Sequence, residues 1–211
     1  MEIQRRFFNF LPQVEERQDG EATMQVFRGL ASSVGNEYTL YEDSNNVFSE
    51  VIAKGAFRNV ANDDIRVLLN HDPNLILGRT ASGTAKVEER EDGLYYEWVN
   101  DPNISYSRDL AISIQRGDIS QSSFAFRIKN YEDKYTKMDD GRTKVLRTIT
   151  EMEKVYDVSP VTYPANPDTK VSQRDLQDAF QRAQEEIEER KHNNTTIIHL
   201  GLRLNKKRST I

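Results

Sequence analysis

Two long stretches of alternating apolar and polar residues, separated by a short polar turn, constrain this chain more than any other feature. They are SSFAFRIKNYEDKYTK (122–137) and TKVLRTITEMEKVYDVSPVTY (143–163), and Asp140-Gly141 lies between them. A period of two is typical of strands that bury one face, and Asp-Gly is a common hairpin turn. The sequence therefore predicts a long antiparallel hairpin. Residues 123 and 157 each lie 17 positions from Asp140, so we expect them nearly opposite each other.

Further strands and helices are expected around this hairpin. The stretches ATMQVFRGLAS, IRVLLNHD, TAKVEERE and GLYYEWVN alternate in the same way, and Asp92-Gly93 provides a turn between the last two. One short helix is predicted to begin near Lys54-Gly55-Ala56-Phe57. Another is predicted across ISYSRDLAISIQRGD, with Asn103 as its cap and Gly117 at its end. The predicted fold class is mainly β with peripheral helices (α+β).

The last fifth of the chain has a different composition. Residues 171–191 favour a helix, but their apolar stripe is thin and consists of Leu176, Phe180 (with Ala179 and Ala183) and Ile187. We expect this helix to lie against a partner or in solvent rather than in the core. The basic end NKKRSTI follows it. The sequence thus predicts one domain over residues 1–170 and a C-terminal helix and tail over residues 171–211.

Composition excludes several classes of chemistry. The 211 residues include no cysteine, which excludes thiol nucleophiles, disulfides and thiolate zinc sites. We find no metal-ligand spacing and no glycine-rich phosphate loop, so neither metal nor cofactor is expected. The net charge of −5 argues against a nucleic-acid partner. No apolar run approaches the roughly 20 residues of a membrane span and no signal peptide is recognisable, so we expect a cytoplasmic protein without a membrane partner.

Three residues remain that could act together. Histidines occur only at 71, 192 and 199, and the latter two lie in the tail. His71 ends the apolar run VLLNHD, where the alternative is a hydrogen-bonded turn of Asn70, His71 and Asp72. In DISQSSFAFRI the hydroxyls either close a turn or include a nucleophile, and Ser122 competes with Ser123 for that role. Asp157 lies within an apolar strand and needs a polar partner.

A serine hydroxyl becomes a good nucleophile when a base removes its proton, and imidazole titrates near neutral pH. A carboxylate can orient that imidazole and stabilise its cation. The sequence therefore predicts Ser123, His71 and Asp157 as catalytic residues, provided that the fold brings them together.

Four stretches, in this order, resemble the prohead maturation proteases of tailed bacteriophages, which are related in fold to the herpesvirus assemblin proteases. They are VIAKGAF (51–57), LLNHDPNLILGR (68–79), DISQSSFAFRI (118–128) and YDVSPVTYPANPDT (156–169). His71 matches the family's histidine, and the Ser-Phe-Ala-Phe order favours Ser123 over Ser122. Asp157 stands where many relatives have glutamate, and Ala125 replaces a common glycine.

The resemblance implies a closed or nearly closed antiparallel barrel surrounded by helices. It also implies an endopeptidase that cleaves scaffold protein, or the scaffolding segment of the major capsid protein, inside the assembling prohead in the host cytoplasm. Self-cleavage would remove the tail, and a homodimer is suggested by the related viral enzymes. Two alternatives stay open: a non-catalytic module that binds scaffold through its acidic helix, and a serine-lysine peptidase.

Overall fold

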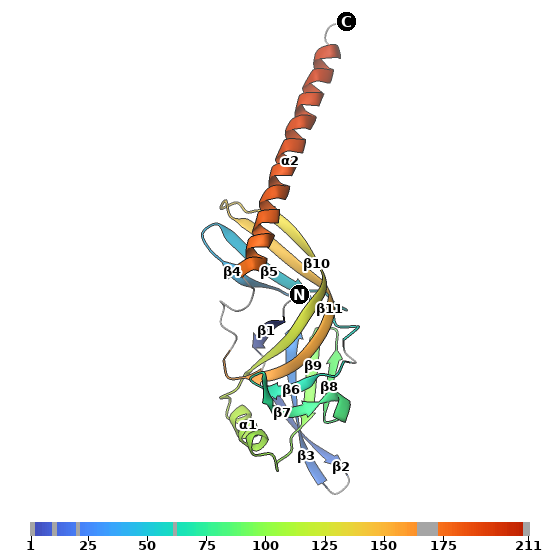
Figure 1. Cartoon of the computed structure of the whole chain (residues 1–211), viewed down its shortest axis with the longest axis vertical. Coiled ribbons are helices and arrows are strands. Elements are labelled where there is room, and N and C mark those ends of the chain that lie inside the picture. The colour runs from blue at the N-terminus through green and yellow to red at the C-terminus, as the bar shows by residue number, and fades with distance from the viewer. Residues whose placement is uncertain (1–2, 10–11, 20–21, 61–62, 164–172, 209–211) are drawn as a thin grey trace.

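The computed structural model describes residues 3–9, 12–19, 22–60, 63–163 and 173–208. Two β-sheets form the body, α1 (Ser105–Gln115) lies at one end and α2 (Gln173–Arg208) projects from the other (Figure 1). The first sheet has the order β1 (Gln4–Asn9), β10 (Gln121–Lys137), β11 (Thr143–Val161), β5 (Asn46–Ile52) and β4 (Glu37–Glu42). In addition, β6 (Arg66–Leu69) pairs with β11, and β7 (Asp72–Arg79) pairs with β6. The second has the order β2 (Gln13–Asp19), β3 (Ala22–Ser33), β9 (Gly93–Val99) and β8 (Ala85–Glu89), and a short 3-10 turn, η1 (Thr80–Ser82), links β7 to β8.

The chain is mainly β with few helices, as predicted, but the expected antiparallel barrel is wrong in two respects. First, β11 pairs with β5 and β6 in parallel, so the larger sheet is mixed. Second, the sheet does not close within the described residues. Its end strands β1 and β4 meet through side chains, with the rings of Phe8 and Tyr38 5.6 Å apart, and share no backbone ladder.

The predicted hairpins form. Strands β10 and β11 pair antiparallel around Asp140-Gly141, and β8 and β9 pair across residues 90–92. The long hairpin begins with Lys137 opposite Thr143, but irregularities between Ala125 and Tyr131 then change the register. Such bulges add residues to one strand without adding partners. As a result Asp157 lies opposite Ala125 rather than Ser123, two residues from the predicted position.

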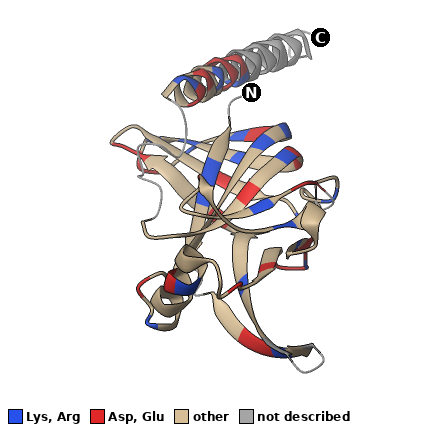
Figure 2. Cartoon of the chain, turned by 60° about the horizontal axis from the view of Figure 1, so that its bottom comes forward, with Lys and Arg blue, Asp and Glu red and all other residues tan. Residues whose placement is uncertain are grey.

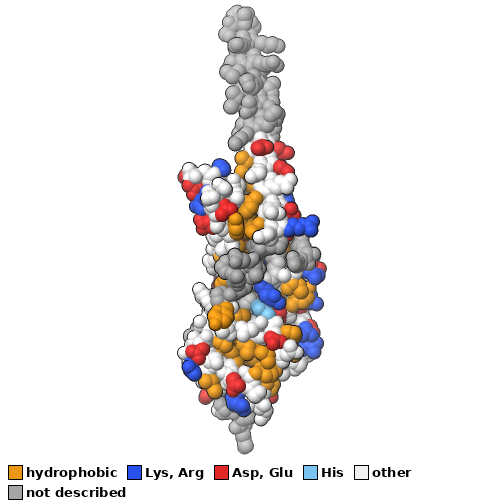
Figure 3. Space-filling model, turned by 60° about the vertical axis from the view of Figure 1, so that its left-hand side comes forward, with side chains coloured by type: hydrophobic (Ala, Val, Ile, Leu, Met, Phe, Trp, Pro, Cys, Tyr) orange, Lys and Arg blue, Asp and Glu red, His pale blue; other side chains and the backbone are white. Residues whose placement is uncertain are grey.

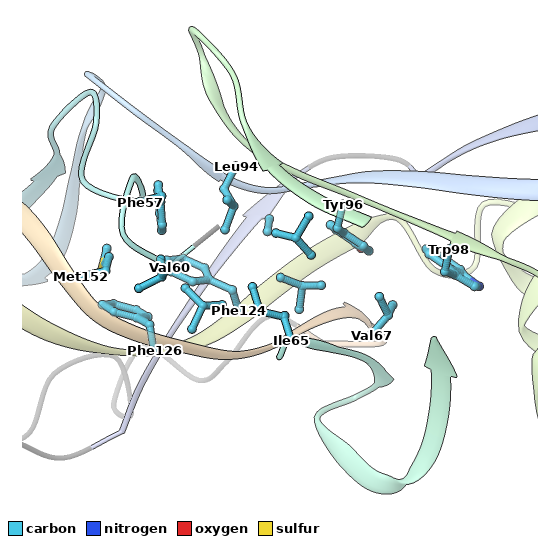
Figure 4. Packing of buried hydrophobic residues seen from close by; sticks show 14 of the residues in the cluster. Phe57, Val60, Ile65, Val67, Leu94, Tyr96, Trp98, Phe124, Phe126 and Met152 are labelled. Atoms are coloured by element: carbon cyan, nitrogen blue, oxygen red, sulfur yellow. The ribbon is translucent and has the colours of Figure 1, made fainter. Parts of the chain in front are cut away.

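The main core fills the space between the two sheets. Phe27 and Trp98 of the second sheet stack with ring centres 5.0 Å apart. Phe124 and Phe126 of β10 stack at 4.5 Å, and Phe57 contacts Phe124 edge-on. All five rings are essentially fully buried and lie in one cluster (Figure 4). The even-numbered face of β10 therefore belongs to the core from Ser122 to Ile128.

A two-residue turn joins β6 to β7 and carries His71. Leu69 lies opposite Asp72, and Asn70 and His71 between them have φ values of 55° and 58°. Positive φ at both central residues is the geometry of a tight type I′ hairpin, in which asparagine is favoured. The Asn70 side chain donates to Thr162 Oγ1 at 3.1 Å and accepts from the Thr162 N–H at 2.8 Å. The alternative of a hydrogen-bonded turn is thus realised, and the turn is tied to the end of β11.

Two of the local helix predictions are wrong. Residues 54–57 form successive turns instead of a helix, because Gly55 adopts φ 83°, which is incompatible with a right-handed helix. Asn103 does not cap α1: it bonds to the Asp101 carboxylate, and Ile104 occupies the cap position. Gly117 does follow the end of α1, with φ 82° and its N–H on the Ile114 carbonyl, as predicted.

Helix α2 is longer than predicted and packs more closely. Ala179 and Ala183 are fully buried against Leu40, Phe48 and Val145. Hydrophobic side chains gather along the base of the helix (Figure 3), and charged residues of both signs occupy its described outer surface (Figure 2). The prediction that this segment lies only in solvent or against a partner is therefore wrong, because two small alanines let the helix approach β4 and β5. No helix within the described ranges is long and apolar enough to cross a membrane.

The packing of α2 can be tested with one charge. Ala179→Glu places a carboxylate in a fully buried contact and should release the helix from the sheet. We expect protease cleavage within α2 to quicken by roughly tenfold or more, because burying the charge costs at least about 1.4 kcal/mol. Gln177→Glu adds the same charge on the exposed side and serves as the control. Equal cleavage rates for the two variants would contradict the packing.

The turn makes a separate prediction. Asn70→Val forces a β-branched residue into a left-handed conformation and removes two hydrogen bonds, so the free energy of unfolding should fall by about 2–3 kcal/mol. Asn70→Gly keeps the backbone conformation accessible and should lose only about 1 kcal/mol. Urea unfolding followed through Trp98, the single tryptophan, measures both values. Equal losses would show that the backbone conformation is not a constraint.

Candidate active site

Adjacent serines at the start of β10 point to opposite faces of the sheet. The Ser122 hydroxyl lies 2.8 Å from the Tyr96 hydroxyl inside the core, where burial raises the pKa of the Tyr96 phenol. The Ser123 Oγ atom lies on the other face, 2.7 Å from His71 Nε2. Ser120 precedes the strand and is exposed. Of the three hydroxyls, only that of Ser123 contacts the imidazole.

The imidazole of His71 is held between a serine and a carboxylate. Its Nδ1 atom lies 2.5 Å from Asp157 Oδ1, and its side chain is 12% exposed. Because an ionised carboxylate only accepts hydrogen bonds, the network assigns a proton to Nδ1. In the neutral ring Nε2 is then the acceptor, and it faces Ser123. The three residues predicted from the sequence therefore meet in one place.

Asp157 enters the site from β11. A shift of two residues in the hairpin register keeps it on the same face as Ser123, because side chains on a strand alternate. Its side chain is 11% exposed, so its charge is held largely away from water and requires hydrogen-bond donors. The shorter acid at this position reaches the imidazole directly.

Sequence analysis missed a fourth residue, Ser159. Its hydroxyl donates to Asp157 Oδ1 at 3.1 Å and accepts from the His71 backbone N–H at 3.2 Å. It is fully buried and lies opposite Ser123 in the ladder. A signal was present, since a residue two positions after Asp157 on a strand shares its face. Ser159 thus connects the carboxylate with the strained turn.

No group of three or more histidine, aspartate or glutamate side chains in the described part of the chain is arranged to hold a metal ion. Within the described residues, the Ser123 hydroxyl forms hydrogen bonds with His71 Nε2 and with the Arg6 carbonyl oxygen. The arrangement pairs a hydroxyl with a base and the base with an acid, which is the requirement for nucleophilic catalysis by serine.

Comparisons with known proteins found a solved structure and a protein family that are similar to this chain. The solved structure of the bacteriophage T4 capsid assembly protease, gp21, is similar over 77% of this chain and 98% of that chain, with a TM-score of 0.46 and 13% identity. No curated protein matches. The model of the family described as "Caudovirus prohead serine protease" matches residues 12–193, which include His71, Ser123 and Asp157 and begin after β1. A match over most of the chain shows that this protein belongs to the caudovirus prohead serine protease family, the hydrolases of phage capsid maturation.

Proposed function

We propose that the chain is an endopeptidase that cleaves peptide bonds with Ser123 as nucleophile, His71 as general base and Asp157 as the residue that orients His71. The observation that carries this proposal is the continuous chain of contacts, 2.7 Å from Ser123 Oγ to His71 Nε2 and 2.5 Å from His71 Nδ1 to Asp157 Oδ1. These distances are within hydrogen-bond reach for proton transfer.

The reaction proceeds in two halves. Ser123 Oγ attacks the scissile carbonyl carbon while its proton passes to His71 Nε2, and the same proton then goes to the departing amine. Water, activated by the same imidazole, hydrolyses the acyl-enzyme and regenerates Ser123. Asp157 stabilises the imidazolium formed in each half. Ser159 acts as a positioning residue, because its single hydroxyl bonds to both the carboxylate and the backbone of His71.

The proposed substrates are scaffold protein or the scaffolding segment of the major capsid protein, cut inside the prohead in the host cytoplasm. Membership in the prohead protease family supports this assignment. We also propose that the chain removes its own C-terminal segment, residues 171–211, and that it works as a homodimer. The projection of α2 away from the sheets would leave such a segment accessible (Figure 1).

The two alternatives find less support. A non-catalytic scaffold-binding module would not require a buried hydroxyl, imidazole and carboxylate in line. A serine-lysine peptidase would require a lysine amine at Ser123 Oγ, and within the described residues the side-chain partner of that atom is His71. Loss of activity in His71→Ala would support the histidine base, whereas survival of activity would favour a lysine.

The adjacent serines provide a matched test. Ser123→Ala should fold and lose cleavage of the capsid precursor by roughly 10⁶-fold, since the nucleophile is absent. Ser122→Ala removes the partner of Tyr96 and should lower the free energy of unfolding by about 1–3 kcal/mol while cleavage continues. Mass spectrometry of the precursor fragments measures cleavage. Defined fragments from Ser123→Ala, or their loss only in Ser122→Ala, would refute the assignment of the nucleophile.

The supporting residues make a graded prediction. Asp157→Asn should lower kcat by roughly 10³- to 10⁴-fold, because the amide cannot stabilise an imidazolium. Ser159→Ala should lower kcat by only about tenfold with little change in KM, which corresponds to one hydrogen bond of about 1.4 kcal/mol. Ser159→Thr retains the hydroxyl and should recover part of the loss. Steady-state kinetics on a precursor peptide distinguish these outcomes, and a Ser159→Ala effect on KM alone would contradict a positioning role.

A further inference from the structure

Strand β1 lies directly beside Ser123. It pairs antiparallel with β10, with Phe7 opposite Ser123 and Arg6 opposite Phe124. The Ser123 hydroxyl donates a hydrogen bond to the Arg6 carbonyl oxygen at 2.9 Å. Ser123 is only 1% exposed. A peptide carbonyl therefore cannot reach Oγ while the neighbouring chain segments keep these positions.

The hydrogen bond to Arg6 also affects the proton. A serine hydroxyl has one proton, and two acceptors compete for it here: the Arg6 carbonyl and the neutral Nε2 of His71. When the proton points to Arg6, His71 cannot remove it. Both contacts are satisfied together only if Nε2 itself donates to Ser123 Oγ, and such an imidazolium is no base. With β1 in place, the resting site is therefore held out of its productive state.

A buried ion pair fixes β1 on the sheet. Arg6 Nε and Nη2 donate to the two carboxylate oxygens of Glu50, each at 2.8 Å, and the Tyr38 hydroxyl donates to the same carboxylate at 2.5 Å. The side chains of Arg6 and Glu50 are 2% and 1% exposed. Burial, together with the Glu50 charge, raises the pKa of Tyr38, so its phenol stays a neutral donor. Removing one member of such a pair strands a buried charge, so the pair acts as a strong anchor.

Within the described residues, the edge of β1 that faces away from β10 pairs with no other strand. A hollow of about 230 Å³ is lined by residues 6–9 and by residues 38–40 of β4, and no backbone ladder joins the two strands within the described residues. In addition, β1 precedes residue 12, where the match to the protease family begins. Strand β1 thus lies outside the matched segment, and its contacts include the ladder with β10, the pair of Arg6 with Glu50 and the packing of Phe8 on Phe124 and Tyr38.

We propose that β1 is an intramolecular inhibitory strand that occupies the peptide-binding edge of β10, and that catalysis requires its departure. This inference rests on the proposed function, because it assigns a regulator to the same nucleophile. Departure of β1 exposes Oγ and removes the competing carbonyl. It also frees the backbone N–H and C=O groups of β10 that face β1, and an extended substrate peptide can pair with these groups as a new strand. The site is then specific for extended peptide segments that can displace or replace β1.

A reversible cross-link tests whether β1 must move. Asn9 and Gln121 lie opposite each other, with Gln121 Nε2 2.7 Å from Asn9 Oδ1, so their side chains share one face. Opposed residues of an antiparallel pair lie within the Cα separation that a disulfide needs. The chain has no cysteine of its own, so Asn9→Cys/Gln121→Cys forms a single defined bond. The probe is a fluorophosphonate, which phosphonylates an active serine with loss of fluoride, and peptide mass spectrometry reports the modified residue.

We expect oxidation of this double variant to slow labelling of Ser123 by about tenfold or more, and reduction to restore it, because labelling follows the population with β1 displaced. The control Lys134→Cys/Leu146→Cys places a disulfide between β10 and β11, far from β1. Its labelling rate should be the same in the oxidised and reduced forms. Arg6→Gln/Glu50→Gln weakens the anchor without stranding a charge and should label faster than the unaltered chain.

The outcomes separate the two proposals. Equal labelling of the oxidised and reduced Asn9/Gln121 variant overturns the inhibitory role of β1 and leaves the nucleophile assignment intact. No labelling of Ser123 in any form, including the reduced variant and Arg6→Gln/Glu50→Gln, overturns the proposed function. Labelling that persists in Ser123→Ala overturns it as well.

Discussion

The left-handed turn at Asn70 and His71 is the constraint on which the site depends. A two-residue hairpin loop with positive φ at both positions presents the imidazole from a rigid point rather than from a mobile loop. Its conformation is unfavourable for most side chains, and the surrounding contacts hold it: Asn70 is clamped to Thr162, and the His71 N–H bonds to Ser159. Because both partners lie at the end of β11, that strand fixes the imidazole and also supplies the carboxylate that it contacts.

The two faces of β10 serve different purposes over the same short segment. Phe124 and Phe126 are part of the core between the sheets, together with the Ser122 hydroxyl that meets Tyr96. Ser123 and Ala125 face the opposite way, toward the turn and Asp157. The Ser123 hydroxyl, placed between the buried Ser122 and Phe124, has little freedom to move, since packing on one face fixes the side chains on the other. This placement explains why three serines within four positions precede a strongly apolar strand.

The burial of Arg6 and Glu50 follows from the curvature of the larger sheet. As the sheet curls, β1 approaches β4 and β5 without forming a ladder to β4, and Arg6 and Glu50 meet in the space that results. Apolar residues in place of the whole pair could give similar net stability, but separating its two members leaves a buried charge unpaired and is costly. The pair therefore defines which strand can occupy the position. It therefore suits a segment that must find one register beside the nucleophile. At the other end of the sheet, Ala179 and Ala183 of α2 pack against Leu40, Phe48 and Val145.

The sequence by itself determined the long hairpin, the strand-rich class and the absence of thiol chemistry, which follow from local information: alternation, turn residues and composition. It also predicted that His71, Ser123 and Asp157 act together, and there the choice of Ser123 over Ser122 came from the resemblance to the protease family. It did not determine the register near Asp157, the contribution of Ser159, the position of β1 or the docking of α2. Periodicity identifies which face of an element is buried, but edge pairing and bulges depend on partners far away in the chain. Only the tertiary structure decided these, because the parallel pairing of β11 with β5 and β6, the open edge between β1 and β4 and the anchor of Arg6 on Glu50 are all contacts between distant segments.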